Sequence, residues 1–199
     1  MIVIKIGGSL FHRGRELVRE IIEYSNARDE TILIVPGGSI FADTVRRISA
    51  TEEAAHWMAV LAMEQYGYYL GNGNDVKLID SLDIHGKGAF ILLPYNLLKK
   101  NDELPHTWDV TSDTIAAWIA QKLGARFIKA TDVDGIYMDG ALKKELEASE
   151  LVGKETCVDA HLPHFLMENK MDCEIINGNC PGRLKNALEN GVTGTLIKG

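Results

Sequence analysis

Short apolar runs alternate with amphipathic segments along the whole chain, and this alternation constrains the fold more than any other feature of the sequence. The runs at 2–6 (IVIKI) and 31–36 (TILIVP) are apolar at almost every position, as is typical of parallel strands that are covered on both faces. Between them, residues 15–28 carry Leu17 and Ile21 at helical spacing. The alternation predicts an α/β protein, a three-layer α/β/α sandwich with a mostly parallel central sheet.

The same pattern continues to the C-terminal end of the chain. Further helices are predicted at 40–48, 52–70, 112–123, 160–170 and 181–191. Further strands are predicted at 75–82, 88–94, 173–179 and 194–199, and another runs into a loop within 125–137. Thr51 is a candidate N-cap, Gly124 a candidate helix end, and Pro181 stands near the first turn of the last helix. The polar segment 97–109 predicts a connection or flap, so we expect one domain over residues 1–199.

Composition argues against several classes of protein. The formal net charge of -7 is unlike that of a general nucleic-acid binder, which needs excess Lys and Arg. No apolar run approaches the roughly 20 residues that cross a bilayer, and the chain starts without a basic region before an apolar core. We therefore expect a cytoplasmic protein with neither nucleic acid nor membrane as a partner. The cysteines Cys157, Cys173 and Cys180 are odd in number and share no CxxC spacing, so neither a disulfide framework nor a zinc site is indicated.

Four glycine-containing loops follow apolar strands, at 5–9 (KIGGS), 35–39 (VPGGS), 129–135 (KATDVDG) and 176–182 (INGNCPG). Ligands of open α/β sheets bind beyond the carboxyl ends of the strands. Neither GGS loop fits the P-loop or the dinucleotide fingerprint, and each alone is compatible with a plain turn. Together, two strand–GG–Ser units that feed helices offer two nests of backbone N–H donors for anions. The sequence thus predicts a site that holds several phosphates in a row, as a kinase requires.

Four segments, KIGGSL, VPGGSIFAD, DVTSDTIAAWIA and ATDVDGIY, resemble the ordered motifs of the amino-acid-kinase superfamily. This superfamily includes acetylglutamate, aspartate, uridylate and isopentenyl phosphate kinases, and the resemblance extends to IINGNCPGRLKNAL and the terminal GTLI. It implies an amino-acid-kinase (carbamate-kinase-like) fold, ATP-dependent phosphoryl transfer and a homo-oligomer, dimeric or larger. The pieces AHWMAVLAMEQYG and TCVDAHLPHFL are most similar to the branch that phosphorylates [5-(aminomethyl)furan-3-yl]methyl phosphate to its diphosphate in methanofuran biosynthesis.

The resemblance implies two catalytic residues. Lys5 matches the lysine that lies beside the transferring phosphoryl group and offsets its charge. Asp113 matches the carboxylate that orients the catalytic lysines or approaches the metal. Each residue also has a simpler interpretation. Lys5 is compatible with a lysine that extends from an edge strand into solvent, and Asp113 with Ser112 makes a good helix start.

The remaining candidates divide between a nucleotide side in the C-terminal half and an acceptor side in the N-terminal half, although the first GGS loop also serves ATP. The residues implied for ATP are Gly7, Gly8, Ser9, Lys129, Thr131, Asp132, Asp134 and Tyr137. Those implied for the acceptor are Gly37, Gly38, Ser39, Arg46 and His56, with Arg47 as an alternative to Arg46. Acidic residues near phosphates imply Mg2+, carried mainly by the ATP phosphates and not by a protein metal site. Lys129 and the arginines are also compatible with solvent-exposed charges, and His56 with an ordinary helix histidine.

One motif of the superfamily is missing. Acetylglutamate-type members carry a second catalytic lysine in a GGM...K motif, which would fall within 153–164, where this chain reads GKETCVDAHLPH. Lys154 stands too early to replace it, and His161 or His164 could supply only conditional charge. We therefore expect a phosphate acceptor in place of an amino-acid carboxylate. Uridylate or isopentenyl phosphate are alternative acceptors, and a non-catalytic nucleotide-binding regulator or storage protein is the alternative of a different class.

Overall fold

The computed structural model describes residues 1–101 and 103–199. Its helices are α1 (Gly14–Arg28), α2 (Ser39–Arg46), α3 (Glu52–Gly71), α4 (Tyr95–Lys100), α5 (Ser112–Leu123), α6 (Leu162–Asn169) and α7 (Arg183–Asn190), with short 3-10 helices η1 (Gly8–Leu10) and η2 (Ala148–Leu151). Its strands are β1 (Ile2–Ile6), β2 (Thr31–Pro36), β3 (Lys77–Ile79), β4 (Gly88–Leu92), β5 (Arg126–Thr131), β6 (Tyr137–Met138), β7 (Ala141–Leu142), β8 (Glu145–Glu147), β9 (Cys173–Asn177) and β10 (Thr195–Lys198).

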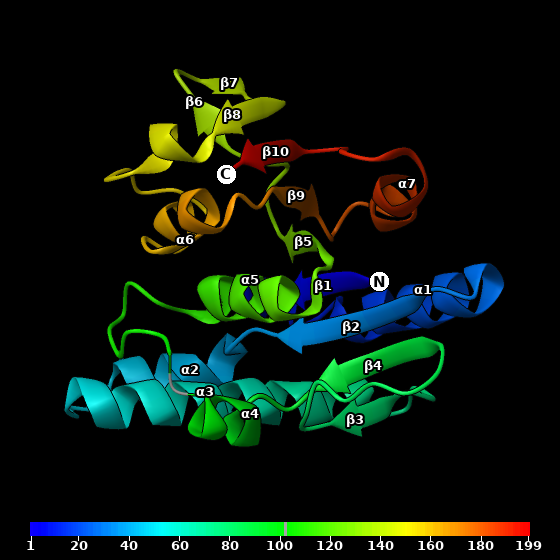
Figure 1. The fold of residues 1–199 in the computed structure, drawn as a ribbon, viewed down its shortest axis with the longest axis horizontal. Helices are drawn as coiled ribbons and strands as arrows, with labels where there is room; N and C mark the ends of the chain where they lie inside the picture. The colour runs from blue at the N-terminus through cyan, green and yellow to red at the C-terminus, as the bar shows by residue number, and fades with distance from the viewer. Residues whose placement is uncertain (102) are drawn as a thin grey trace.

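Within the described residues, eight strands form one sheet in the order β3-β4-β2-β1-β5-β9-β10-β8, which runs from the bottom to the top of the molecule in Figure 1. The pairings are parallel except that between β9 and β10. The expected three-layer sandwich with a mostly parallel sheet is confirmed. β6 and β7 form a separate antiparallel hairpin beside this sheet.

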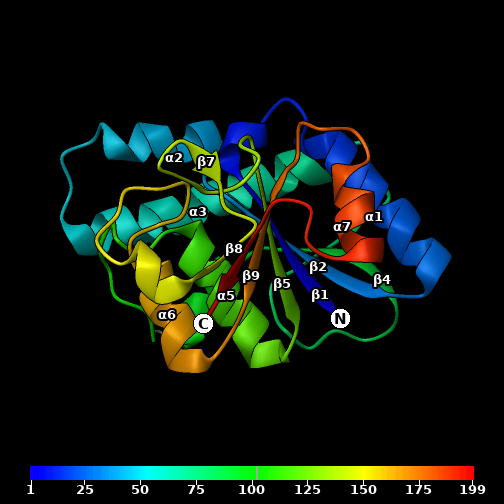
Figure 2. The same ribbon diagram turned by 90° about the horizontal axis from the view of Figure 1, so that it is seen from above.

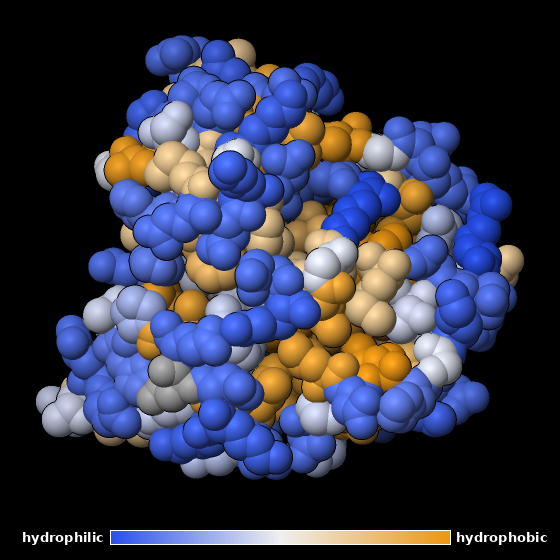
Figure 3. Space-filling model, in the orientation of Figure 1, coloured by the Kyte–Doolittle hydropathy of each residue, from blue (hydrophilic) through white to orange (hydrophobic). Residues whose placement is uncertain are grey.

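Helices α1 and α7 cover one face of the sheet, and α5 and α6 cover the other (Figure 2). Alternate residues of each strand face opposite sides. In β1, Ile2 and Ile4 pack with α1 and α7, whereas Val3 packs with α5 and α6. Lys5 lies two residues after Val3, so its side chain is directed to the α5 face. In the same orientation as Figure 1, the main area of exposed hydrophobic residues lies below and to the right of the centre of the visible face (Figure 3).

Local signals explain where the principal helices begin and end. The Thr51 side chain accepts a hydrogen bond from the Ala54 N–H and caps α3, as its position predicts. Helix α5 ends at Gly124, whose left-handed backbone (φ 56°) suits a residue without a Cβ. Pro181 precedes the first residue of α7 by two positions.

Several elements differ from their predicted extent. The strand expected at 75–82 is limited to β3, and α4 takes up the first residues of the predicted connection at 97–109, of which residue 102 lies outside the described residues. Neither the β6–β7 hairpin nor β8 was expected, because strands of two or three residues leave almost no periodicity to recognise. The first GGS loop runs into the short 3-10 helix η1, and α1 begins only at Gly14, so an α-helix does not follow that loop directly.

Candidate active site

A cavity of about 450 Å³ opens at the carboxyl ends of β1, β2 and β5. This size is within the range of small-molecule binding sites. Both halves of the chain contribute to it, through the loops after these strands, helices α2 and α3, and the start of α5. The candidate residues that line it are Lys5, Gly7, Gly8, Ser9, Gly38, Ser39, Arg46, His56, Asp113, Lys129 and Thr131.

The two GGS loops touch each other at the mouth of the sheet. Because β1 and β2 are adjacent, the loops that follow them are neighbours, and the Gly37 N–H donates to the Ile6 carbonyl at 2.9 Å. A Cβ on Gly8 would lie 2.5 Å from backbone atoms of Ser39, so only glycine fits there. Ser39 itself has a left-handed backbone (φ 52°), which is uncommon for a residue with a side chain. The close approach leaves bare backbone facing the cavity, as a phosphate cradle requires.

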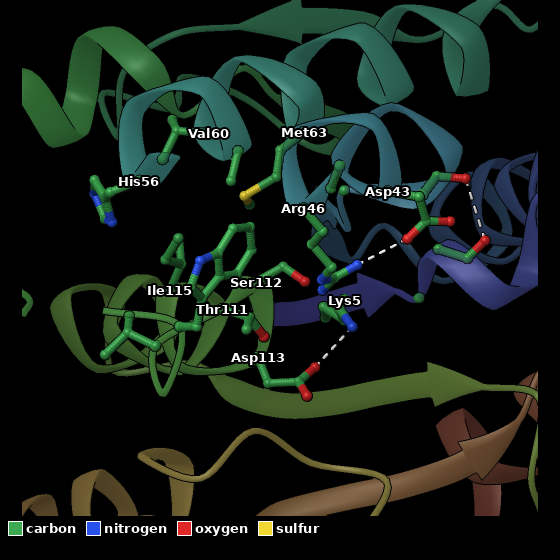
Figure 4. A pocket seen from close by; sticks show the side chains of 18 of the residues that line it. Lys5, Asp43, Arg46, His56, Val60, Met63, Thr111, Ser112, Asp113 and Ile115 are labelled. Atoms are coloured by element: carbon green, nitrogen blue, oxygen red, sulfur yellow. Dashed lines mark hydrogen bonds and ion pairs between the residues drawn. The ribbon is translucent and has the colours of Figure 1, made fainter. Parts of the chain in front are cut away.

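Three buried charges form the floor of the cavity. The Lys5 Nζ lies 2.7 Å from Asp113 Oδ1, and the two side chains face each other in Figure 4. The Lys129 Nζ contacts the other carboxylate oxygen of Asp113 and also donates to the Cys157 carbonyl. The exposed fractions of the three side chains are 7%, 5% and 3% for Lys5, Asp113 and Lys129 respectively. One carboxylate therefore serves two ammonium groups.

The surroundings shift all three pKa values. Burial alone would raise the pKa of Asp113, but the Lys129 and Lys5 ammonium groups hold it well below its usual range. Burial lowers the pKa of Lys5, and the neighbouring Lys129 cation adds to that effect. Burial also acts downward on Lys129, yet the Asp113 carboxylate raises the pKa of this lysine above its ordinary value. An anion bound beside the two lysines would favour the charged form of both.

A residue that the sequence did not single out, Asp159, fixes the start of α5. Its carboxylate accepts hydrogen bonds from the backbone N–H groups of Thr111 (2.9 Å) and Thr114 (3.0 Å), and also from that of Leu162 at the start of α6 (2.9 Å). The backbone N–H of Asp159 donates to Asp113 at 3.2 Å. Sequence spacing gives no sign of this cap, because Asp159 reaches α5 from a loop far along the chain.

Helices α2 and α3 form the wall opposite the lysines, where Figure 4 shows Val60 and Met63. Arg46 pairs with Asp43 at 2.8 Å and stacks over the Trp108 ring, with its charge near the cavity. His56 is buried at the end away from Asp43 in Figure 4, and its ring stacks on His106 with the centroids 4.0 Å apart. This wall combines apolar surface with one arginine and an imidazole.

Other candidate residues do not line this cavity. Gly37 packs against Gly8, and Asp132 accepts a hydrogen bond from the Thr131 hydroxyl at 3.2 Å. Asp134 accepts from Asn177 at 3.1 Å, and Tyr137 is 54% exposed in β6. The roles predicted for these four residues in binding ATP or the acceptor stay predictions. Arg47, Lys154, His161 and His164 also lie outside the residues that line the cavity.

The donor set on the cavity floor fits phosphates better than a metal ion. Both oxygens of Asp113 are in ion-pair contact with lysines, although Oδ1 accepts no hydrogen bond from the described residues, so a cation could coordinate this carboxylate directly only by displacing a lysine. In the part of the chain that the structure describes, no group of three or more His, Cys, Asp or Glu side chains is placed to hold a metal. The lysine ammonium groups and the backbone N–H groups of the glycine loops are hydrogen-bond donors. Phosphate oxygens accept hydrogen bonds from such groups.

Two further observations concern the cysteines and the described helices. Cys157, Cys173 and Cys180 are free thiols. None of the described helices combines the length and the apolar character needed to cross a bilayer.

Comparison with known proteins places this arrangement among kinases. The family model described as the amino acid kinase family matches residues 85–171. A curated relative, [5-(aminomethyl)furan-3-yl]methyl phosphate kinase from Methanocaldococcus jannaschii, is 33% identical over 202 residues, which cover 95% of this chain and 93% of the relative. Uridylate kinase from Thermofilum pendens is 24% identical over 233 residues, covering 98% of this chain and 97% of that protein.

Solved structures share the fold. The crystal structure of uridylate kinase from Archaeoglobus fulgidus matches with a TM-score of 0.72 at 19% identity, over 99% of this chain and 100% of the other. The UMP kinase from Ureaplasma parvum matches with a TM-score of 0.74, also at 19% identity, over 100% of this chain and 99% of the other. At this level of identity the likeness concerns the fold alone.

Proposed function

The chain belongs to the amino acid kinase family and is an ATP-dependent kinase, and we propose that its acceptor is a small phosphate monoester. The observation that carries the proposal is the cavity floor, where Lys5 and Lys129 share Asp113 beneath two touching glycine loops. Two cations and two sets of backbone donors match the charge of a phosphate acceptor in line with the ATP phosphates.

The reaction that this site would support is in-line phosphoryl transfer. An oxygen of the acceptor phosphate bonds to the γ-phosphorus of ATP while the bond from that phosphorus to the β,γ-bridging oxygen breaks, and ADP leaves with the electron pair. A dianionic acceptor phosphate needs no general base, which agrees with a cavity floor whose carboxylate, Asp113, is paired with Lys5 and Lys129. Lys5 offsets the charge on the transferring group, and Gly8 and Ser39 hold the phosphates on either side. Asp113 keeps the lysines in place.

For the acceptor, we propose [5-(aminomethyl)furan-3-yl]methyl phosphate, which would become the diphosphate as in methanofuran biosynthesis. The curated relative at 33% identity carries that activity in its name. Val60 and Met63 of α3, together with Trp108 from the segment before α5, offer apolar and aromatic surface for a small ring. Arg46 or His56 lies within the same cavity for the acceptor phosphate. Uridylate and isopentenyl phosphate remain the alternative acceptors.

Three further parts of the proposal depend on the sequence and the family. Mg2+ would enter with ATP, held through the phosphate oxygens, where it would neutralise part of their charge. A homo-oligomer stays a prediction, and the exposed Leu61 and Tyr68, seven residues apart on one face of α3, would suit a contact between two copies. A cytoplasmic location, one domain and the division into an acceptor half and a nucleotide half also stay predictions.

The experiment is a measurement of ADP release with a panel of acceptors. The panel contains the aminomethylfuran phosphate, UMP, isopentenyl phosphate and N-acetylglutamate, each with ATP and Mg2+. We expect turnover with the first, and a loss in kcat of about 10²–10³ in Lys5→Met, because a transition-state charge partner is removed. Lys77→Met, which changes an exposed lysine on β3, is the matched control.

The outcomes separate the candidate functions. Turnover with UMP or isopentenyl phosphate alone would replace the proposed acceptor and keep the reaction. Turnover with N-acetylglutamate alone would contradict the phosphate acceptor. Binding of ATP without turnover of any acceptor would favour the nucleotide-binding regulator or storage protein.

A further inference from the structure

Two lysines stand directly opposite each other on adjacent parallel strands. The register of β1 and β5 pairs Lys5 with Lys129, and both side chains are buried on the α5 face of the sheet. Like charges at directly opposed positions destabilise a sheet, and burial adds a desolvation cost. An apolar residue at either position would fit this face of the core better. The retained pair therefore calls for a functional explanation.

Asp113 offsets part of the repulsion between the two lysines, but one carboxylate does not neutralise both of their charges. Its two oxygens are divided between the lysines, so that in the ion-pair contacts of this cluster two cations share one anion. The Asp159 carboxylate acts on Lys5 only as a weaker electrostatic influence than Asp113, and it accepts hydrogen bonds from the backbone N–H groups at the start of α5. The floor of the cavity is thus an electropositive surface that an anion would complete.

Lys129 is also held in one position. Besides Asp113, its ammonium contacts the Cys157 carbonyl, and the residue lines the same cavity as Lys5, Gly8 and Ser39. The Cys157 carbonyl belongs to the 153–164 segment, where this chain lacks the lysine of the GGM...K motif. That segment therefore supplies a backbone acceptor that orients a lysine from another strand.

We propose that Lys129 is a second catalytic cation, whose ammonium contacts the transferring phosphoryl group beside Lys5 and takes the place of the lysine missing from residues 153–164. This inference rests on the proposed phosphoryl transfer. The bonds made and broken are those of that reaction, and Lys129 exchanges no proton. It offsets the charge on the equatorial oxygens while the γ-phosphorus passes between ADP and the acceptor.

The test uses Lys129→Met, which leaves Asp113 paired with Lys5 alone and so keeps a balanced ion pair in the core. Lys198→Met is the matched control. It removes a partly exposed lysine of β10 that pairs with Glu145 of β8. Lys129→Arg is the second variant, because it keeps the cation if the methionine variant does not fold. Folding is checked by circular dichroism and thermal unfolding before any assay.

The first readout is kinetic. We expect Lys129→Met to lose about 10²–10³ in kcat, with the dissociation constant of ATP changed less than tenfold. The kcat of Lys129→Arg should be at least tenfold higher than that of Lys129→Met, and the kcat of the control should match that of the parent protein. A folded Lys129→Met with kcat within threefold of the parent would overturn the inference. If only Lys129→Arg folds, a kcat no higher than that of Lys5→Met would overturn it.

The second readout separates direct contact from an effect through Asp113. Aluminium fluoride with ADP imitates the transferring phosphoryl group, and we expect it to tighten ADP binding to the parent protein at least tenfold in calorimetry. In Lys129→Met that tightening should disappear, and in the control it should persist. If kcat falls and the tightening remains, Lys129 only positions Asp113 and the inference is wrong. A parent protein that binds ADP but turns over no acceptor would instead contradict the proposed function.

Discussion

Asp113 is the residue on which the stability of the site depends, because it is the shared counter-charge of two buried lysines. In Asp113→Asn, Lys5 and Lys129 would face each other without a carboxylate. We expect the free energy of unfolding at pH 7 to fall by about 3–5 kcal/mol, the usual effect of leaving a buried charge uncompensated. Urea unfolding measures this loss, and Asp75→Asn, at an exposed position, is the control.

The same variant should steepen the rise of stability with pH in the alkaline range. Burial already lowers the folded pKa of Lys5 below the ordinary 10.5, and without Asp113 the pKa of both lysines should fall further. The unfolded chain then binds more protons than the folded one, so stability should rise more steeply from pH 7 towards 10.5 than in the parent protein. In the parent protein, the lowered pKa of Asp113 contributes stability that is present above pH 3.8 and is lost as the pH falls further. Equal alkaline slopes for Asp113→Asn and Asp75→Asn would contradict this account.

At the scale of elements, Asp159 joins a loop to two helices. Asp159→Ala would leave the N–H groups of Thr111, Thr114 and Leu162 without their acceptor, so we expect a loss of about 2–3 kcal/mol in unfolding free energy. Because Asp113 stands in the first turn of α5, kcat should fall at least tenfold. Thermal unfolding and the ADP-release assay measure the two effects.

Controls for Asp159 follow from its neighbours in the loop. Glu155→Ala removes an exposed carboxylate nearby and should change neither the free energy of unfolding nor kcat. Asp159→Asn keeps one acceptor oxygen and should recover part of both losses. If Asp159→Ala lowers stability and leaves kcat intact, the link from this cap to Asp113 is wrong.

The elements show what the sequence could predict. The long helices and strands could be predicted, because Thr51 marks the start of one helix, Gly124 marks the end of another, and the apolar runs mark buried strands. The antiparallel placement of β10 beside β9 and the two-residue strands of the hairpin were not, since they depend on tertiary pairing. At the site, Lys5 and Asp113 could be named from motifs. The contact of Lys129 with Asp113 depends on strand register, and the role of Asp159 depends on a loop that returns to α5, neither of which periodicity encodes.

At the scale of the whole molecule, the cavity draws its lining from residues 5–63 and 107–157, so a nucleotide bound there would link both halves of the chain. A ligand that binds only the folded state stabilises it by about 2.7 kcal/mol at one hundred times its dissociation constant. For a domain of this size that corresponds to a rise in Tm of about 5–10 °C.

We therefore expect ATP with Mg2+ to raise Tm by that amount and adenosine to raise it much less, because the two glycine loops and the lysines act on phosphates. In Lys5→Met the shift with ATP should shrink, while in Lys77→Met it should match the parent. Differential scanning calorimetry at several ATP concentrations measures these shifts. Equal shifts with adenosine and ATP would mean that the cavity recognises the nucleoside and not the phosphates, and the electropositive floor would then need another explanation.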